Sequence, residues 1–218
     1  MRRMTLSSAG LALILTALLA SGALAHGGNP DFRSEFRAIA PAVPGLEVQV
    51  LNYDDRLLLI NQTRKTVLVR GYENEPYARL RSDGTVEVNR RSPSYYLNEE
   101  RYGGTPVPKN ASPDAPPRWS EVSRTGRFET HDHRIHWMSK GTTPPQVTDE
   151  DKRTKVFDWR VPIEVGAQPA ALTGTLFWEP SSGGGVPTGA IIALAALVVL
   201  TVVLFVVSRR VRAGQRAR

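Results

Sequence analysis

Three of the four histidines in this 218-residue chain lie within six residues, at His131, His133 and His136. Neutral imidazole is a common ligand of copper and zinc. On a β-strand, alternate residues point to the same face, so His131 and His133 are expected to offer two nitrogens to one ion, with His136 on the opposite face. The spacing predicts a metal site. The alternative is a set of surface or hydrogen-bonded histidines without a metal.

The fourth histidine, His26, lies where a secretory signal peptide is expected to end. The first 25 residues combine two arginines near the start with an uncharged apolar run over residues 9–20. They close with Ala23-Leu24-Ala25, a small-x-small sequence that signal peptidase accepts. Ser21-Gly22-Ala23 is a second possible cleavage sequence. Cleavage after Ala25 makes His26 the first residue of the mature chain.

An N-terminal histidine chelates a metal through both its α-amine and its ring. The α-amine has a pKa of about 7.7–8.0, low enough to release its proton readily to a metal. Gly27 and Gly28 allow this end to fold back towards the histidine cluster. The chain has no cysteine, so a soft-metal site depends on His and Met. A nitrogen-rich set of His26, His131 and His133 suits Cu(II), with His136 as a further ligand or a group that orients one.

The other end of the chain predicts a membrane anchor. Residues 188–207 form an uncharged run of twenty residues, about 30 Å long as a helix, which matches the hydrocarbon core of a bilayer. Arginines follow in residues 208–218, which predicts a cytoplasmic tail. Residues 181–187 are rich in Ser, Gly and Pro and are expected to form a flexible linker. The predicted location is the cell membrane, with a single span and the domain of residues 26–180 outside.

The net charge of +7 does not indicate nucleic-acid binding. Two of the 28 basic residues lie in the predicted signal and five in the predicted tail. The remaining 21 equal the number of acidic residues, all of which lie in the exported part. The predicted domain is therefore neutral and lacks the basic excess typical of nucleic-acid-binding proteins.

Residues 26–180 are expected to form an all-β domain, an antiparallel sandwich of the immunoglobulin-like or cupredoxin-like kind. Leu46 to Val50 alternates apolar and polar residues, and Asp83-Gly84 between two such segments predicts a hairpin. Further strands are expected at residues 56–60, 66–70, 77–81, 85–89, 119–122, 128–138, 156–165 and 170–178. Asp31 to Ala40 is expected to be a short helix. The proline-rich segment 90–118 is expected to be an ordered loop packed on the sheet.

The combination of a signal peptide, an exported β-sandwich and a mature N-terminal histidine resembles exported copper carriers of the CopC type and membrane-anchored YcnI-like proteins. In CopC-like proteins the N-terminal His works with an Asp-x-His pair. The resemblance implies Cu(II) ligation by His26 with His131 or His133. It covers the architecture and these positions only, and the order here is His-Asp-His, so Asp132 would face away from the two histidines on a regular strand.

Three functional hypotheses follow. The first is a membrane-anchored copper carrier, buffer or chaperone that serves a copper transporter or assembly factor, without catalytic turnover. The second is a surface interaction module that presents the proline-rich segment 91–117, with purely structural histidines. The third is an oxidative copper enzyme that uses the N-terminal His. Glu99, Glu100 and Arg101 are interpreted as solvated charges, and Asp54 and Asp55 as turn residues.

Overall fold

The structure is a computed structural model that describes residues 29–180 and 188–216. The chain divides between Pro180 and Ser181 into two compact units, which are described separately. The predicted signal peptide, His26 and the predicted linker lie outside the described residues.

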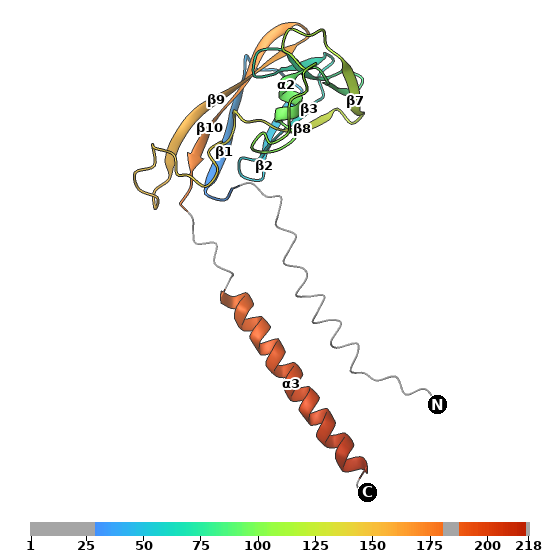
Figure 1. Cartoon of the computed structure of the whole chain (residues 1–218), viewed down its shortest axis with the longest axis vertical. Coiled ribbons are helices and arrows are strands. Elements are labelled where there is room, and N and C mark those ends of the chain that lie inside the picture. The colour runs from blue at the N-terminus through green and yellow to red at the C-terminus, as the bar shows by residue number, and fades with distance from the viewer. Residues whose placement is uncertain (1–28, 181–187, 217–218) are drawn as a thin grey trace, which may run out of the picture. The chain divides into compact units, whose positions relative to one another are not determined.

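The first unit is built from two antiparallel sheets (Figure 1). The larger sheet has seven strands in the order β1-β10-β9-β4-β5-β6-β7, and the smaller has three in the order β2-β3-β8. The strands are β1 (Phe32–Ala40), β2 (Leu46–Leu51), β3 (Arg56–Asn61), β4 (Val67–Arg70), β5 (Pro76–Leu80), β6 (Val86–Asn89), β7 (Trp119–Ser123), β8 (Arg127–His131), β9 (Thr154–Val165) and β10 (Gln168–Trp178). The prediction of an antiparallel all-β domain is confirmed.

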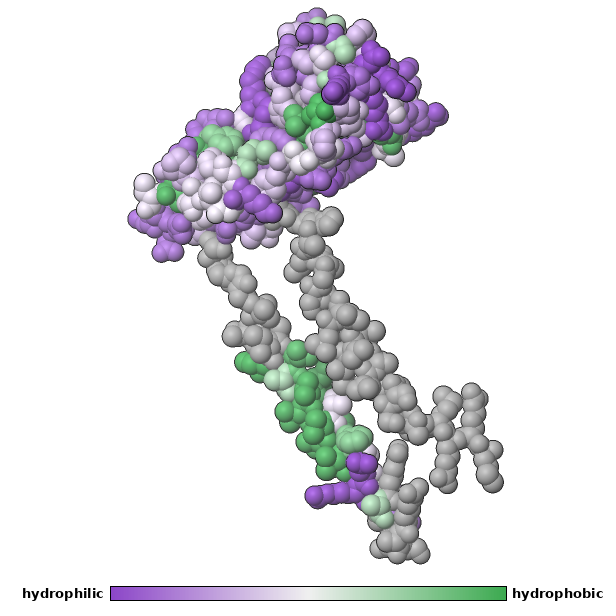
Figure 2. All heavy atoms as spheres, in the orientation of Figure 1, coloured by the Kyte–Doolittle hydropathy of each residue, from purple (hydrophilic) through white to green (hydrophobic). Residues whose placement is uncertain are grey.

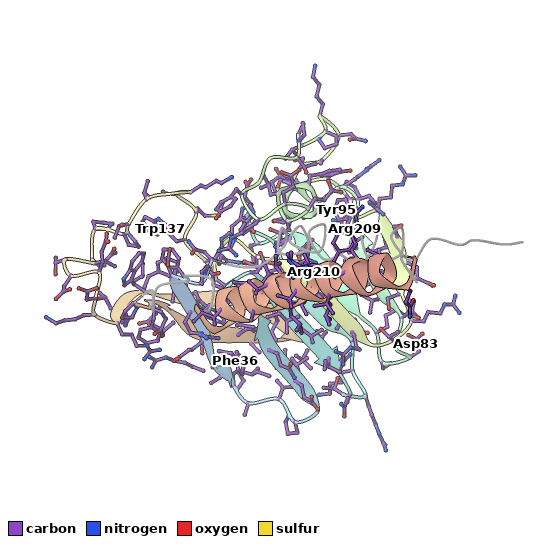
Figure 3. All side chains as sticks on the ribbon, turned by 90° about the horizontal axis from the view of Figure 1, so that it is seen from below. Phe36, Asp83, Tyr95, Trp137, Arg209 and Arg210 are labelled. Carbon is purple, nitrogen blue, oxygen red and sulfur yellow. The ribbon has the colours of Figure 1, made fainter. Side chains whose placement is uncertain are left out.

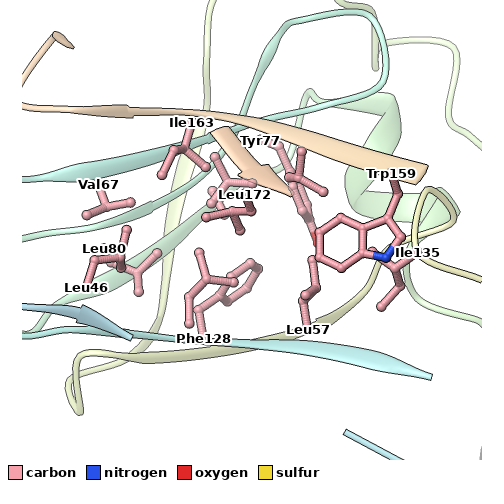
Figure 4. Packing of buried hydrophobic residues seen from close by; sticks show 14 of the residues in the cluster. Leu46, Leu57, Val67, Tyr77, Leu80, Phe128, Ile135, Trp159, Ile163 and Leu172 are labelled. Carbon is pink, nitrogen blue, oxygen red and sulfur yellow. The ribbon is translucent and has the colours of Figure 1, made fainter. Parts of the chain in front are cut away.

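One hydrophobic core lies between the sheets (Figure 4). Alternate residues of β9 supply it, since Val161, Ile163 and Val165 are buried whereas Arg160 is exposed. Leu57 of β3 contributes from the opposite sheet. Period-two alternation of this kind is what a strand with one buried face requires, so the sequence pattern and the packing agree.

The hairpin predicted at Asp83-Gly84 is confirmed, and the strands predicted at residues 156–165 and 170–178 form a second hairpin. β5 and β6 pair around the turn that contains Asp83 (Figure 3), where Gly84 has a φ of +84°. β9 and β10 pair from Val165 and Gln168 outward, so Gly166 and Ala167 form the turn. Both turn residues have positive φ, as hairpin turns with two central residues require.

The prediction of a helix over residues 31–40 is wrong, because this segment forms β1. β1 pairs with the edge of β10 from Phe32 opposite Trp178 to Ala40 opposite Ala171. This pairing satisfies the backbone groups on one side of β1 over most of its length, with an irregularity between Phe36 and Ala38. The helical spacing of Phe32, Phe36 and Ile39 is a weak local preference that the sheet edge overrides.

The segment from Arg90 to Arg118 is ordered, as predicted. It contains the short helix α2 (Pro93–Leu97), which carries Tyr95 (Figure 3). The guanidinium of Arg90 lies over the Tyr95 ring, 4.3 Å from its centroid. The side-chain oxygen of Asn89 accepts hydrogen bonds from the backbone N–H of Arg91 at 3.0 Å and of Arg118 at 2.8 Å. One buried amide thus ties both ends of the segment to β6.

The second unit is the helix α3 (Thr188–Arg216). Apolar side chains from Leu194 to Val207 are exposed along it, as Figure 2 shows in green. Among the residues whose side chains the structure describes, no helix is both long enough and apolar enough to cross a membrane.

Candidate metal centre

The histidine cluster lies in a turn, and the prediction of a strand reaching Met138 is wrong. β8 ends at His131, and the N–H of Ile135 donates to the carbonyl of Asp132 at 3.0 Å. The Asp132 carboxylate accepts hydrogen bonds from the guanidinium of Arg134 at 2.8 and 2.7 Å, which closes the turn. The rings of His133 and His136 are thereby brought within 5.5 Å, measured between centroids.

His131 is held by the β2–β3 turn. Its Nδ1–H donates to the backbone carbonyl of Asp55 at 3.1 Å, and the Asp55 carboxylate lies 3.3 Å from the same nitrogen. Burial lowers the pKa of His131 and outweighs the opposing effect of Asp55. The ring is therefore a neutral imidazole whose Nε2 carries the lone pair.

His133 is held by the segment that follows α2. Its Nε2–H donates to the carbonyl of Glu100 at 3.2 Å, which leaves Nδ1 as the lone-pair nitrogen. The ring stacks on Tyr72 with 5.6 Å between centroids. Gly103 has a φ of +71°, and a Cβ on it would lie 2.9 Å from Cε1 of His133. Only glycine therefore lets this turn approach the imidazole so closely.

His136 is almost completely buried, at 1% exposure, and neither of its ring nitrogens has a hydrogen-bond partner among the described residues. The ring of Tyr102 lies 6.2 Å away, edge to face. Burial, followed by the nearby positive charge of Arg101, lowers the pKa of His136 to about 3. The side chain is thus neutral near pH 7, and a metal would displace no proton from it.

Arg101 joins the histidines to two carboxylates of the β2–β3 turn. Its guanidinium donates to Asp54 at 2.8 Å and to Asp55 at 3.0 Å. Burial raises the pKa of Asp54 against the opposing effects of Arg101 and of the backbone N–H of Asn29.

Buried polar atoms without a partner gather at this end of the domain. Among the described residues, five such side-chain atoms occur: Asp54 Oδ1, Asn98 Nδ2, Arg101 Nε, and Nδ1 and Nε2 of His136. Asn98 belongs to the same network, because its side-chain oxygen accepts from the hydroxyl of Tyr72. An unsatisfied buried group costs about 1–3 kcal/mol. Buried polar groups of this kind take a partner, which can be an ordered water, an ion or a ligand.

The sequence interpretation missed the residues that hold the histidines. Arg101 was interpreted as solvated charge, but its side chain is 12% exposed and bridges two aspartates. Asp54 and Asp55 were interpreted as turn residues only, yet both are buried. A pair of acidic residues in a tight turn gives no sequence signal of burial, because the cation that compensates it lies 46 residues away.

The chemistry of these side chains fits a copper or zinc ion, since the available donors are neutral imidazole nitrogens. Within residues 29–180 and 188–216, no three His, Asp or Glu side chains are placed so that they could hold a metal ion. The candidate ligand His26 lies outside the described residues. Comparison with protein-family models, with curated proteins and with solved structures gave no match.

Proposed function

We propose that this protein is a membrane-anchored, extracytoplasmic copper-binding protein that carries, buffers or hands on copper. Its ligands are His26 at the mature N-terminus with His131, His133 and His136. The observation that carries the proposal is His136, a buried neutral imidazole with two unpartnered nitrogens beside the ring of a second histidine.

The surroundings of the other two histidines support the same function. Metal-binding histidines usually donate one ring N–H to a carbonyl or carboxylate, which fixes the tautomer and aims the other nitrogen at the ion. His131 donates in this way to Asp55 and His133 to Glu100. Both rings are therefore prepared as ligands before an ion arrives.

The participation of His26 is part of the proposal and rests on the sequence, since this residue lies outside the described residues. Two residues, Gly27 and Gly28, separate His26 from Asn29, and an extended chain covers at most about 10 Å over these three steps. Asn29 lies at Asp54, which is linked through Arg101 to Asp55 and so to His131.

Bound copper would supply a Lewis-acidic centre. The protein would bind the ion and exclude competing ligands. Nitrogen donors favour Cu(II). We propose binding without turnover, with a copper transporter or assembly factor at the membrane as the partner. The resemblance to CopC-like and YcnI-like proteins supports this proposal at the level of architecture.

The finer fold and the location are part of the proposal. Two antiparallel sheets around one core suit an immunoglobulin-like or cupredoxin-like sandwich. The uncharged sequence of residues 188–207, followed by arginines, supports a single membrane span with a short cytoplasmic tail.

The second hypothesis, an interaction module presenting residues 91–117, has less support. The segment that follows α2 packs inward, where Glu100 and Arg101 contact the histidines and the buried aspartates. Its remaining surface stays available for a partner, and the experiment below decides between the two hypotheses.

The test is competitive Cu(II) and Zn(II) titration of residues 26–180, compared with the His136→Leu variant. We expect one tight Cu(II) site that the substitution weakens at least tenfold, because a ligand is lost. Thr175→Val is the matched control: Thr175 is buried on β10 and hydrogen-bonded to Asp158, so the substitution alters stability without touching a histidine. Equal Cu(II) affinities for the wild type and His136→Leu would overturn the proposal.

A further inference from the structure

A pocket lies at the end of the first unit that carries the β9–β10 turn (Figure 1). Three segments line it: residues 41–44 between β1 and β2, residues 62–65 between β3 and β4, and residues of the β9–β10 hairpin. Its volume is about 460 Å³, within the range of roughly 300–1,000 Å³ that is usual for small-ligand sites. Asn61, the last residue of β3, leads into the pocket, whereas Arg56, the first, pairs with His131. These two ends of β3 are about 17 Å apart, so the pocket is separate from the candidate metal centre.

Backbone hydrogen bonds hold the three segments of the pocket together. The N–H of Gln62 donates to the carbonyl of Gly45 at 2.7 Å. The N–H of Gly166 in the hairpin turn donates to the carbonyl of Thr66 at 2.9 Å. A Cβ on Gly166 would lie 2.9 Å from Cδ of Lys65, so the aliphatic part of this lysine packs on the turn. The pocket is therefore held in shape without a ligand.

The charged side chains of the pocket are positive. Arg64 and Lys65 line it and are exposed, and within the described residues neither side chain has an ion pair or a hydrogen bond. No Asp or Glu is among the described residues that line it. Glu47 lies outside the lining and accepts a hydrogen bond from Gln62 at 3.0 Å. Two uncompensated cations on one wall favour an anion, and a guanidinium suits a carboxylate or a phosphate.

The rest of the pocket wall is largely apolar. Pro41 and Pro44 contribute from the β1–β2 segment, and Pro169 contributes from the hairpin. Val43 is half-buried and Val165 is buried, so the valines line a hollow and do not protrude. A bilayer surface is bound by apolar side chains that protrude into it. The hollow therefore suits a compact apolar body better than a membrane.

We propose that this pocket binds a small amphipathic anion, with a carboxylate or phosphate group on a compact apolar body. Arg64 and Lys65 contact the anionic group, and the prolines pack against the apolar body. The ligand is a free molecule and not a lipid in a bilayer. This site goes beyond the proposed copper function and does not depend on it, because no histidine lines the pocket among the described residues.

The test is a titration of the metal-free domain of residues 26–180 with phenyl phosphate, followed by ¹H–¹⁵N NMR. This domain contains the whole hydrophobic core of the first unit. We expect saturable shifts of the amides of residues 62–65 and of the β9–β10 turn, with the amides around the histidines unchanged. Inorganic phosphate lacks the apolar body and benzyl alcohol lacks the charge, so each should bind about tenfold more weakly. Equal affinity for either probe, or no saturable shifts in the pocket, would overturn the proposal.

A double variant tests the two cations. Arg64→Gln with Lys65→Gln should fold, because both side chains are exposed, and should weaken phenyl phosphate binding about tenfold. Lys109→Gln with Arg118→Gln is the matched control, since it removes two exposed basic side chains outside the pocket. The control should bind phenyl phosphate as the wild type does. Equal weakening in both double variants would show an effect of net charge alone and would overturn the proposal, as would unchanged affinity in the first.

Vesicles of phosphatidylcholine with phosphatidic acid test the source of the anion. We expect no co-sedimentation of the domain with these vesicles. Co-sedimentation that Arg64→Gln with Lys65→Gln abolishes would assign the pocket to a lipid surface and would overturn the assignment to a free molecule.

Discussion

Replacing His136 by leucine should stabilise the metal-free domain. His136 is 1% exposed, and its two ring nitrogens lack partners among the described residues. A structural histidine gains its stabilising effect from hydrogen bonds. Within the described residues neither ring nitrogen has a hydrogen bond of ordinary geometry, and a contact with the Trp137 backbone raises the pKa of His136 only slightly against the larger effect of burial. Leucine is similar in size and carries no polar atom, so the substitution removes the desolvation cost and keeps most of the packing.

The magnitude follows from the two nitrogens. An unsatisfied buried polar group costs about 1–3 kcal/mol, and an apolar replacement of similar volume usually costs less than about 1.5 kcal/mol through imperfect fit. The net expectation is a free energy of unfolding higher by about 2 kcal/mol. For a domain of this size, that raises the Tm by about 4–8 °C.

The assay is urea and thermal unfolding of residues 26–180 at pH 7.5 with a chelator present, followed by tryptophan fluorescence. Thr175→Val serves again as the control, and it should be destabilising because Thr175 donates to Asp158. If His136→Leu lowers stability as much as this control does, His136 is a structural residue, and the argument from its unpartnered nitrogens is refuted.

Three further predictions concern the same end of the domain. The folded-state pKa of His136 lies at about 3, below the unfolded value of 6.5, so only the unfolded chain takes up this proton between the two values. The free energy of unfolding should therefore fall by about 2 kcal/mol from pH 6.5 to pH 5. The His136→Leu variant should lack this part of the decrease in pH-dependent urea titrations, and equal slopes would contradict the assignment. Gly103→Ala should lower the free energy of unfolding more than Gly141→Ala does. Both glycines have φ near +70°, but only at Gly103 would the added Cβ meet His133, at 2.9 Å. Equal decreases in the free energy of unfolding would show that His133 does not occupy this position. Glu75→Gln should lower the free energy of unfolding by about 1–3 kcal/mol. The reason is that the Glu75 carboxylate accepts hydrogen bonds from the hydroxyls of Ser92 and Ser94 at 2.6 and 2.7 Å. An unchanged free energy of unfolding in chemical denaturation would show that these hydrogen bonds do not stabilise α2.

The strands that the sequence predicts well are those whose signal is local. β9 alternates buried with more exposed residues and joins β10 through a Gly-Ala turn, and β5 and β6 flank Asp83-Gly84, so periodicity and turn chemistry agree. β1 fails for the opposite reason. Its spacing of aromatic residues suits a helix, and only the free edge of β10, more than 130 residues away, makes it a strand.

The site shows the same division. Residue type alone identified the histidines as candidate ligands, and their roles stay predictions. Their geometry depends on the end of β8 at His131 and on the Asp132–Arg134 contact that closes the turn. Arg101 could not be recognised from sequence, because its importance comes from carboxylates that reach it only after the sheets have packed.

The most direct test of the account is Cu(II) titration of the domain that begins at His26, read by electron paramagnetic resonance, beside a domain with one extra residue before His26. The account predicts tight binding of one Cu(II) with a nitrogen-rich spectrum, and loss of that spectrum in the extended domain. Binding no stronger than that of a histidine-containing control peptide would contradict the copper function. Tight binding that ignores the extension would exclude the N-terminus from the site.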